Sequence, residues 1–339
     1  MRSWILAFGL AVSMHAQSTP AALSDAAREL AGQKRFDEAE KLWLRAIDAA
    51  PAYFPALFNL GYFYFSAEKF TSAEQWLSRA VEADPKDFNA RYVLGSTLVR
   101  LGKREEALRQ WRRALEIQPG KTQLMQIMSV EYTKGRYFQE AAEMAKRALA
   151  LKSDDPNLYF VAIKAYSDAG DTAAASDLAR RAAARFPESA RANFEHAFHL
   201  QKSGRIDECF PFLKKAMTAD PGYEEPFFLY GEILTREGRN EEAVPFLRAA
   251  LQKRPGYLAA SLVLARTMMN SGKLPEAVAE LQAAIRLEPD QPQPHLLLSQ
   301  IYFRMGDEAG ARREKDLSLK LRRENPAAME VDHGRPFPP

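Results

Sequence analysis

The chain has 339 residues, of which 47% are hydrophobic and 27% are charged, and its formal net charge at pH 7 is +3. This near balance of charge argues against a nucleic-acid partner, which selects strongly basic chains. The one cysteine, Cys209, excludes an internal disulfide framework. Runs of Ala, Leu, Arg and Glu recur, and alternating β-branched stretches are missing, so we expect an all-helical protein.

The N-terminal segment 1–16 has the features of a bacterial-type secretory signal peptide. Arg2 is followed by a nine-residue apolar core from Trp4 to Val12, which is too short to span a bilayer as a helix. We expect cleavage after Ala16, a short linker at 17–19 and a periplasmic or secreted protein with no transmembrane segment. An uncleaved apolar leader on a cytosolic protein is the alternative.

Residues 20–325 repeat with a period of 34 residues. This period is the length of a helix–turn–helix solenoid unit, and nine units fit without insertion or deletion. Prolines mark the period at 51, 85, 119, 187, 221, 255 and 289. The units start at residues 20, 54, 88, 122, 156, 190, 224, 258 and 292.

Four positions within the unit have a consistent residue size. Positions 8, 20 and 27 are small in almost every unit, and position 11 is always bulky. Small residues at 8 and 20 let two helices approach closely, and a small residue at 27 lets the next unit dock. Glycine at position 15 can adopt the left-handed conformation that ends a first helix. Six units have this glycine, namely Gly102, Gly170, Gly204, Gly238, Gly272 and Gly306.

The stretch PALFNLGYFYFSAEKFTSAEQWLSRAVEADP at 55–85 carries this pattern almost intact and resembles the tetratricopeptide repeat family. The resemblance extends over about 90% of the chain. It implies an α-α superhelical solenoid of tandem repeats, in which each repeat contacts only its neighbours. It also implies a non-enzymatic protein whose first helices line a concave groove for a peptide or protein segment.

The groove is expected to be aromatic with basic margins, because positions 5, 9 and 12 are rich in Phe and Tyr while position 13 is often Lys or Arg. Aromatic rings offer large contact areas and arginine binds carboxylates, so an acidic-aromatic peptide would fit. Packing between units is the alternative role of each ring. The predicted groove residues are Phe58, Asn59, Tyr62, Phe65, Tyr92, Arg100, Lys134, Phe160, Phe194, Phe198, Lys202, Phe228 and Arg236.

The segment FNLGYFYF at 58–65 contains two interleaved sets of residues. Leu60, Gly61 and Tyr64 occupy seam positions, whereas Phe58, Tyr62 and Phe65 share the groove face with Asn59 beside them, and Phe63 is left on the flank. Only Asn59 matches the polar groups that carboxylate-clamp and asparagine-ladder members repeat, so both of those binding modes are disfavoured.

One constellation could bind a transition metal. His196 and His199 lie three residues apart in unit six, and Cys209 falls in the partner helix. These residues also suit ordinary core positions, which is the reading we favour. Common nucleotide-binding, hydrolase and metalloprotease motifs are missing, so we expect no cofactor and no enzymatic activity.

The C-terminal part looks like the end of an array. Residues 312–325, RREKDLSLKLRREN, place Lys315 at the normally apolar position 24, which indicates a solvating cap rather than an anion-binding patch. The Pro-rich segment 326–339 is expected to be a disordered or loosely docked tail.

These features together predict an exported scaffold that binds a protein in the cell envelope and serves complex assembly. The first alternative is a self-associating structural array. A remote alternative is a metal-binding or enzymatic protein centred on His196, His199 and Cys209.

Overall fold

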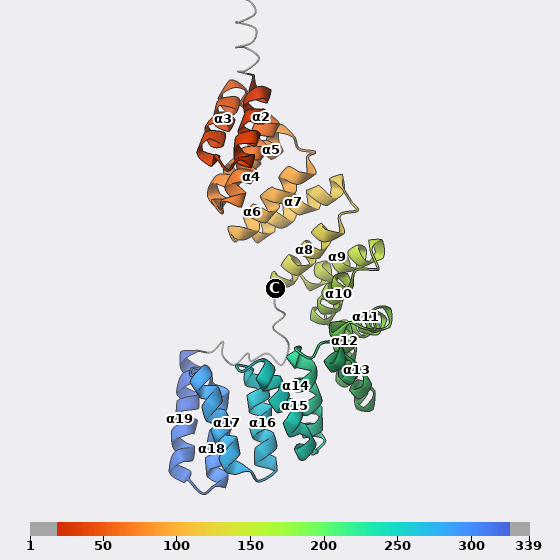
Figure 1. Cartoon of the computed structure of the whole chain (residues 1–339), viewed down its shortest axis with the longest axis vertical. Helices are drawn as coiled ribbons and strands as arrows, with labels where there is room; N and C mark the ends of the chain where they lie inside the picture. The colour runs from red at the N-terminus through yellow and green to blue at the C-terminus, as the bar shows by residue number, and fades with distance from the viewer. Residues whose placement is uncertain (1–18, 326–339) are drawn as a thin grey trace, which may run out of the picture. The chain divides into compact units, whose positions relative to one another are not determined.

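The computed structural model describes residues 19–325, and these residues form eighteen helices and no strand (Figure 1). The predicted all-α fold of tandem helix pairs is confirmed. The predicted signal peptide and the C-terminal tail lie outside the described residues.

The helices form nine pairs, and the first helix of each pair begins 34 residues after the first helix of the preceding pair. The first helices are α2 (Pro20–Gly32), α4 (Phe54–Ser66), α6 (Phe88–Arg100), α8 (Thr122–Lys134), α10 (Pro156–Asp168), α12 (Ala190–Lys202), α14 (Glu224–Arg236), α16 (Leu258–Asn270) and α18 (Pro292–Arg304). The second helices are α3 (Phe36–Ala49), α5 (Phe70–Ala83), α7 (Arg104–Ile117), α9 (Phe138–Leu151), α11 (Thr172–Arg185), α13 (Ile206–Ala219), α15 (Asn240–Lys253), α17 (Leu274–Leu287) and α19 (Glu308–Glu324).

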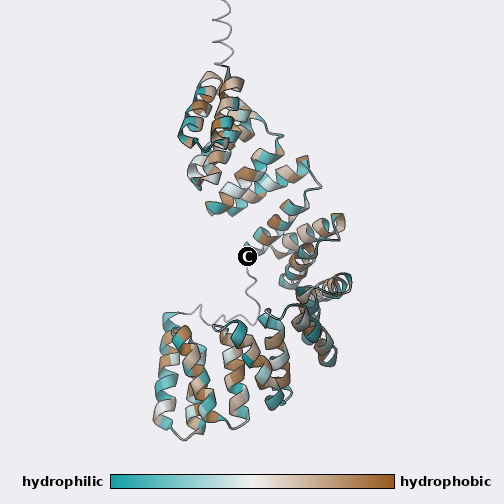
Figure 2. Ribbon diagram, in the orientation of Figure 1, coloured by the Kyte–Doolittle hydropathy of each residue, from teal (hydrophilic) through white to brown (hydrophobic). Residues whose placement is uncertain are grey.

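The chain divides into two compact units between Thr172 and Ala173. In the N-terminal unit, α4 packs against α5 of its own pair and against α2, α3 and α6 of the adjoining pairs. In the C-terminal unit, α18 likewise packs against α19, α17 and α16. Helices therefore contact their neighbours in sequence, as expected for a repeat array. Figure 2 shows hydrophobic and hydrophilic residues sharing the helices, the pattern of amphipathic elements.

Each first helix ends in a left-handed residue at position 15. The six predicted glycines have φ between 74° and 82°. The amide of Gly102 donates to the Val99 carbonyl at 3.0 Å, and that of Lys103 donates to the Leu98 carbonyl at 2.8 Å. This is a Schellman motif, which satisfies the last carbonyls of the helix. Three units adopt the same turn without glycine, at Lys34, Glu68 and Arg136, with φ of 64°, 57° and 64°.

The seam between the two helices of a pair explains the small residue at position 8. A Cβ atom added to Gly95 would lie 2.3 Å from Nε1 of Trp111 at position 24, and one added to Gly61 would lie 2.7 Å from Cγ of Leu77. In the fourth pair the Ser129 hydroxyl donates to the Ala141 carbonyl at 2.8 Å, which joins positions 8 and 20 directly. The close approach predicted for these positions is confirmed.

Position 27 is the most uniform column of the repeat. All nine of its residues are buried, and seven of them are completely so. In the last pair Ser318 replaces alanine, and its hydroxyl donates to the Pro292 carbonyl at 2.8 Å. A small residue at this position is therefore compatible with the packing in every pair.

The left-handed residues give a stability test. Gly238→Ala should lower the free energy of unfolding by about 1 kcal/mol, because an L-residue is strained at positive φ while the space around its Cβ is empty. Lys34→Gly should raise it by up to about 1 kcal/mol, after allowance for the extra freedom of glycine in the unfolded chain. Urea unfolding followed by circular dichroism measures both.

The matched control is Gly120→Ala. Gly120 lies in a turn, has no positive φ, and has no atom within 4 Å of an added Cβ. It should be neutral or slightly stabilising. Equal effects of Gly238→Ala and Gly120→Ala would contradict a role for the left-handed turn.

Candidate functional site

Helix α4 carries a row of four aromatic rings, formed by Phe54, Phe58, Tyr62 and Phe65, which we call the α4 aromatic row. Successive ring centroids lie 5.8, 6.2 and 6.4 Å apart. The residues follow one another at spacings of four, four and three, which places them on one side of the helix. Tyr62 is 50% exposed, and the other three rings are half-buried.

Helix α4 begins at Phe54, and Pro55 in its first turn favours the start of the helix. A proline there removes no intrahelical hydrogen bond and has a helical φ. The opposite side of α4 carries the buried Ala56, Leu57, Leu60 and Gly61, which pack into the core. The helix is therefore fixed by its buried side, and the aromatic row is left on the other.

A basic group completes one end of the α4 aromatic row. Phe65 meets Phe70 of α5 edge to face at 6.0 Å, and the Arg100 guanidinium of α6 lies 4.5 Å from the Phe70 centroid. Arg100 is exposed, and its closest acidic group is Glu68 at 3.7 Å. Because an exposed pair of this kind contributes little free energy, Arg100 can exchange it for a ligand carboxylate.

Helix α6 carries a shorter version of the same arrangement. Phe88 and Tyr92 stack at 5.9 Å, and Nζ of Lys121 lies 5.2 Å from the Phe88 centroid. Tyr92, Phe58 and Phe65 also pack against the buried cluster around Leu94 and Leu98. Part of each ring therefore stabilises the contact between repeats, while the remainder is accessible.

The other predicted groove residues of the N-terminal unit are less available. Nζ of Lys134 lies 2.7 Å from the carboxylate of the buried Glu131, which also faces Arg104 at 3.2 Å. Phe160 is only 6% exposed. Lys134 therefore neutralises a buried charge, and Phe160 is mostly packing.

In the C-terminal unit the predicted rings lie mainly between repeats. Phe194 is 4% exposed and meets Tyr223 edge to face at 5.4 Å, and Phe228 meets Tyr257 at 4.9 Å. Phe198 is half-buried beneath Nζ of Lys202 at 4.7 Å. The contacts of Phe194 and Phe228 lie at junctions between repeats, whereas Phe198 and Lys202 are both on α12, and none of the three rings reaches the 50% exposure of Tyr62.

The remaining basic residue on the predicted groove, Arg236, is exposed. Its guanidinium binds the Glu232 carboxylate one turn earlier on α14 at 2.7 Å. The thirteen predicted residues are thus divided between two compact units. Six of them lie on the neighbouring helices α4 and α6, namely Phe58, Asn59, Tyr62, Phe65, Tyr92 and Arg100.

Sequence reasoning missed two contributors to this surface. Phe54 stands at position 1 and Phe70 at the start of a second helix, and neither position was assigned to the groove. The signal was the i, i+4 spacing of Phe54 and Phe58, repeated by Phe88 and Tyr92. Phe63, left on the flank, stacks on Phe36 of the preceding pair at 5.6 Å.

The histidines and cysteine of the sixth pair occupy separate surroundings. His196 packs edge to face on Phe212 at 4.4 Å, and His199 meets Phe198 at 5.8 Å. The Cys209 thiol donates to the Arg205 carbonyl at 3.3 Å. Within residues 19–325, no group of three or more His, Cys, Asp or Glu side chains is placed to hold a metal ion.

Burial also shifts the pKa values of Cys209 and His196. It raises the pKa of the Cys209 thiol to about 11, with a further increase from Glu208. It lowers the pKa of His196, and the cationic Arg205 and Arg180 lower it further. Cys209 is therefore a protonated thiol at neutral pH, and metal binding or nucleophilic attack requires the thiolate.

None of the helices in the described part of the chain has the length and apolar character needed to cross a membrane.

Comparison with family models identifies the repeats. Models described as tetratricopeptide repeat match residues 24–88, 89–118 and 234–301. Comparison with curated proteins gives no match.

Several solved structures are similar to this chain at low identity. YrrB, whose structure is titled "a TPR protein with an unusual peptide-binding site", is 20% identical, with a TM-score of 0.44 over 54% of this chain and 95% of that one. A tetratricopeptide repeat protein from Parabacteroides merdae is 16% identical, with a TM-score of 0.48 over 74% of this chain and 99% of that one. Yeast Tom70 is 16% identical, with a TM-score of 0.48 over 90% of this chain and 76% of that one.

The state of Cys209 can be tested with a thiol reagent. At pH 8 the native protein should react with Ellman's reagent far more slowly than the unfolded protein, because the thiol is buried and its pKa is raised to about 11. A Gln300→Cys variant provides the control, since Gln300 is exposed. In this variant the introduced thiol should react fast and the Cys209 thiol should react slowly. Fast reaction of both thiols would contradict the buried, protonated state.

Proposed function

Because this chain is a tetratricopeptide-repeat protein, we propose that it is a scaffold that binds a segment of a partner protein across the α4 aromatic row. The repeat fold supports protein binding as the general function.

The observation that carries the proposal is the exposure of Tyr62 in the middle of a continuous row of rings. Its neighbours Phe58 and Phe65 lie within 6.4 Å on either side, so the accessible ring surfaces join into one apolar strip along α4. Rings held by their neighbours lose little conformational freedom when a ligand binds, and Tyr is enriched among the residues that dominate binding energy.

The ligand chemistry follows from the groups around the strip. Apolar or aromatic side chains would cover Phe58, Tyr62 and Phe65, and a carboxylate would reach Arg100. Asn59 lies next to Phe58 and is partly exposed, so its amide can bind the backbone of an extended peptide. An extended acidic-aromatic segment satisfies all three requirements.

The compartment is proposed from the leader at 1–16. Export would place the scaffold in the bacterial envelope or outside the cell, so its partner would be an envelope or secreted protein. A role in the assembly of an envelope complex would use the binding surface on α4.

The binding site can be tested by photocrosslinking and then by mutation. We expect p-benzoylphenylalanine at position 62 to capture one stoichiometric partner in intact cells. The control position is Tyr137, which is 39% exposed but lies outside the row. Phe58→Ala with Tyr62→Ala should weaken binding of that purified partner by at least about 30-fold, the effect of losing a hot-spot group of about 2 kcal/mol.

Stability measurements separate binding from packing. Tyr62→Ala alone should lower the free energy of unfolding by less than about 1 kcal/mol, because half of the ring is already exposed. The proposal fails if position 137 captures the partner as well as position 62. It also fails if the double variant loses about 3 kcal/mol, as a core deletion does, while the refolded protein binds normally.

Export makes a separate prediction. In a bacterial host, the protein should be recovered from the periplasm or medium with Gln17 as its first residue, because cleavage is expected after Ala16. Intact mass and N-terminal sequencing measure this. An Arg inserted into the apolar core, as Leu10→Arg, should retain the uncleaved chain in the cytosol. Cytosolic recovery of the unaltered chain with its leader intact would contradict export.

A further inference from the structure

The ninth helix pair has an open face where the preceding pair is covered. At position 12, Met269 of α16 is 7% exposed, whereas its counterpart Phe303 of α18 is 69% exposed. At position 24, Leu281 is fully buried, whereas Lys315 is exposed. Helix α18 packs against α16 and α17, and no helix in residues 19–325 packs in the same way on α18 and α19.

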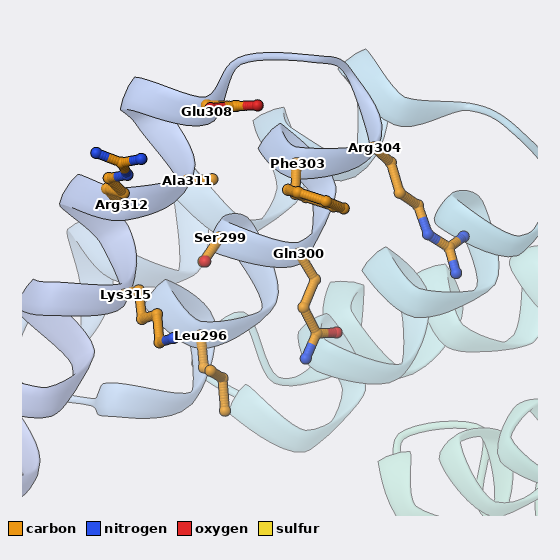
Figure 3. A pocket seen from close by; sticks show the side chains of 9 residues that line it. All are labelled: Leu296, Ser299, Gln300, Phe303, Arg304, Glu308, Ala311, Arg312 and Lys315. Atoms are coloured by element: carbon orange, nitrogen blue, oxygen red, sulfur yellow. The ribbon is translucent and has the colours of Figure 1, made fainter.

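This face is hollowed into a pocket of about 680 Å³ between α18 and α19 (Figure 3). Leu296 and Phe303 provide apolar surface from α18, and Figure 3 shows the Lys315 side chain reaching from α19 toward α18. The pocket lies where position 24 carries Lys315 in place of the large apolar residue that most other pairs have there. Leu77, Trp111, Leu247 and Leu281 are such residues, and all are buried.

The pocket has an excess of positive charge. Arg304, Arg312 and Lys315 line it, with Glu308 as the one acidic residue among them. Within residues 19–325, none of these three cations forms an ion pair or a side-chain hydrogen bond with another residue. Three unpaired cations beside exposed apolar groups are complementary to an acidic, apolar segment.

We propose that residues 326–339 of this chain bind in the pocket and cover the open face. The segment reads PAAMEVDHGRPFPP, in which Met329 and Val331 alternate with Glu330 and Asp332. In an extended peptide, alternate side chains point to opposite sides. Bound in that form, Met329 and Val331 can contact Leu296 and Phe303 while the two carboxylates face the cationic rim.

The length of the segment permits this contact. Lys315 precedes Glu324, the end of α19, by nine residues, a distance of roughly 14 Å along a helix. Glu330 follows Glu324 by six residues, and an extended chain covers about 20 Å in that number. The segment can therefore turn back at the end of α19 and reach the pocket. Because it is tethered, its effective concentration is on the order of millimolar, which favours it over a free peptide of equal affinity.

Disulfide trapping in the full chain tests this contact. Gln300→Cys lines the pocket, and Val331→Cys lies in the proposed ligand. Under mild oxidation this pair should form an intramolecular disulfide about tenfold faster than Arg313→Cys paired with Val331→Cys. Arg313 is exposed on α19 next to Arg312 but does not line the pocket. The native Cys209 is buried and should stay reduced.

Charge exchange provides the second arm. Lys315→Glu should slow trapping between positions 300 and 331 about tenfold, and the further changes Glu330→Lys and Asp332→Lys should restore it. Rescue distinguishes a direct contact from misfolding, which charge exchange would not repair. Equal rates for the Gln300 and Arg313 pairs would overturn the proposal. Predominantly intermolecular disulfides, whose rate depends on protein concentration, would also overturn it and assign the face to a second copy of the chain.

Discussion

The close approach of the two helices in each pair is the constraint on which the other features of this protein depend. At Gly95 there is no room for a Cβ beside Trp111, and at Gly61 there is none beside Leu77. Because the helices meet at these points, the seam positions are reserved for small residues, and the large rings must occupy the remaining faces. The α4 aromatic row is a result of this division. Gly61 holds α4 against α5, and Phe58, Tyr62 and Phe65 are left to face the adjoining repeat and solvent.

Most of the fold could be predicted from the 34-residue period and from the size of the residue at each position of the repeat. A left-handed turn was predicted at six glycines and is present at all six, because a Schellman motif has a simple sequence signal. The same turn at Lys34, Glu68 and Arg136 could not be read from residue type. There the packing of the flanking helices imposes a conformation that the local sequence does not favour, so tertiary contacts override local preference.

The candidate site was harder to predict from the sequence, because residues at the same position of different repeats are not equally exposed to solvent. Phe58 and Phe194 both stand at position 5, yet Phe58 is half-buried and Phe194 is almost completely buried. The difference lies in the neighbours. Phe194 is covered by Tyr223, the residue that precedes α14, whereas Phe58 stacks along its own helix on Phe54 and Tyr62. A period identifies which side of a helix a ring occupies, but exposure depends on the size of the residues opposite it.

The dependence on local neighbours also explains how one chain can have two distinct candidate binding surfaces, the α4 aromatic row and the pocket between α18 and α19. Stability in a repeat array is the sum of terms from each repeat and its nearest neighbours, so a change at one place is felt mainly by the adjoining pairs. The apolar residue of position 24 can therefore be replaced by Lys315 in the last pair without loss of the seam at Gly95 or Gly61. Conversely, the α4 aromatic row depends on its own neighbours, because Phe58 and Phe65 pack against a buried cluster that includes Leu77 of α5 and Leu94 of α6. Each surface is shaped by its own neighbours, and the repeat allows their chemistry to diverge while the backbone stays the same.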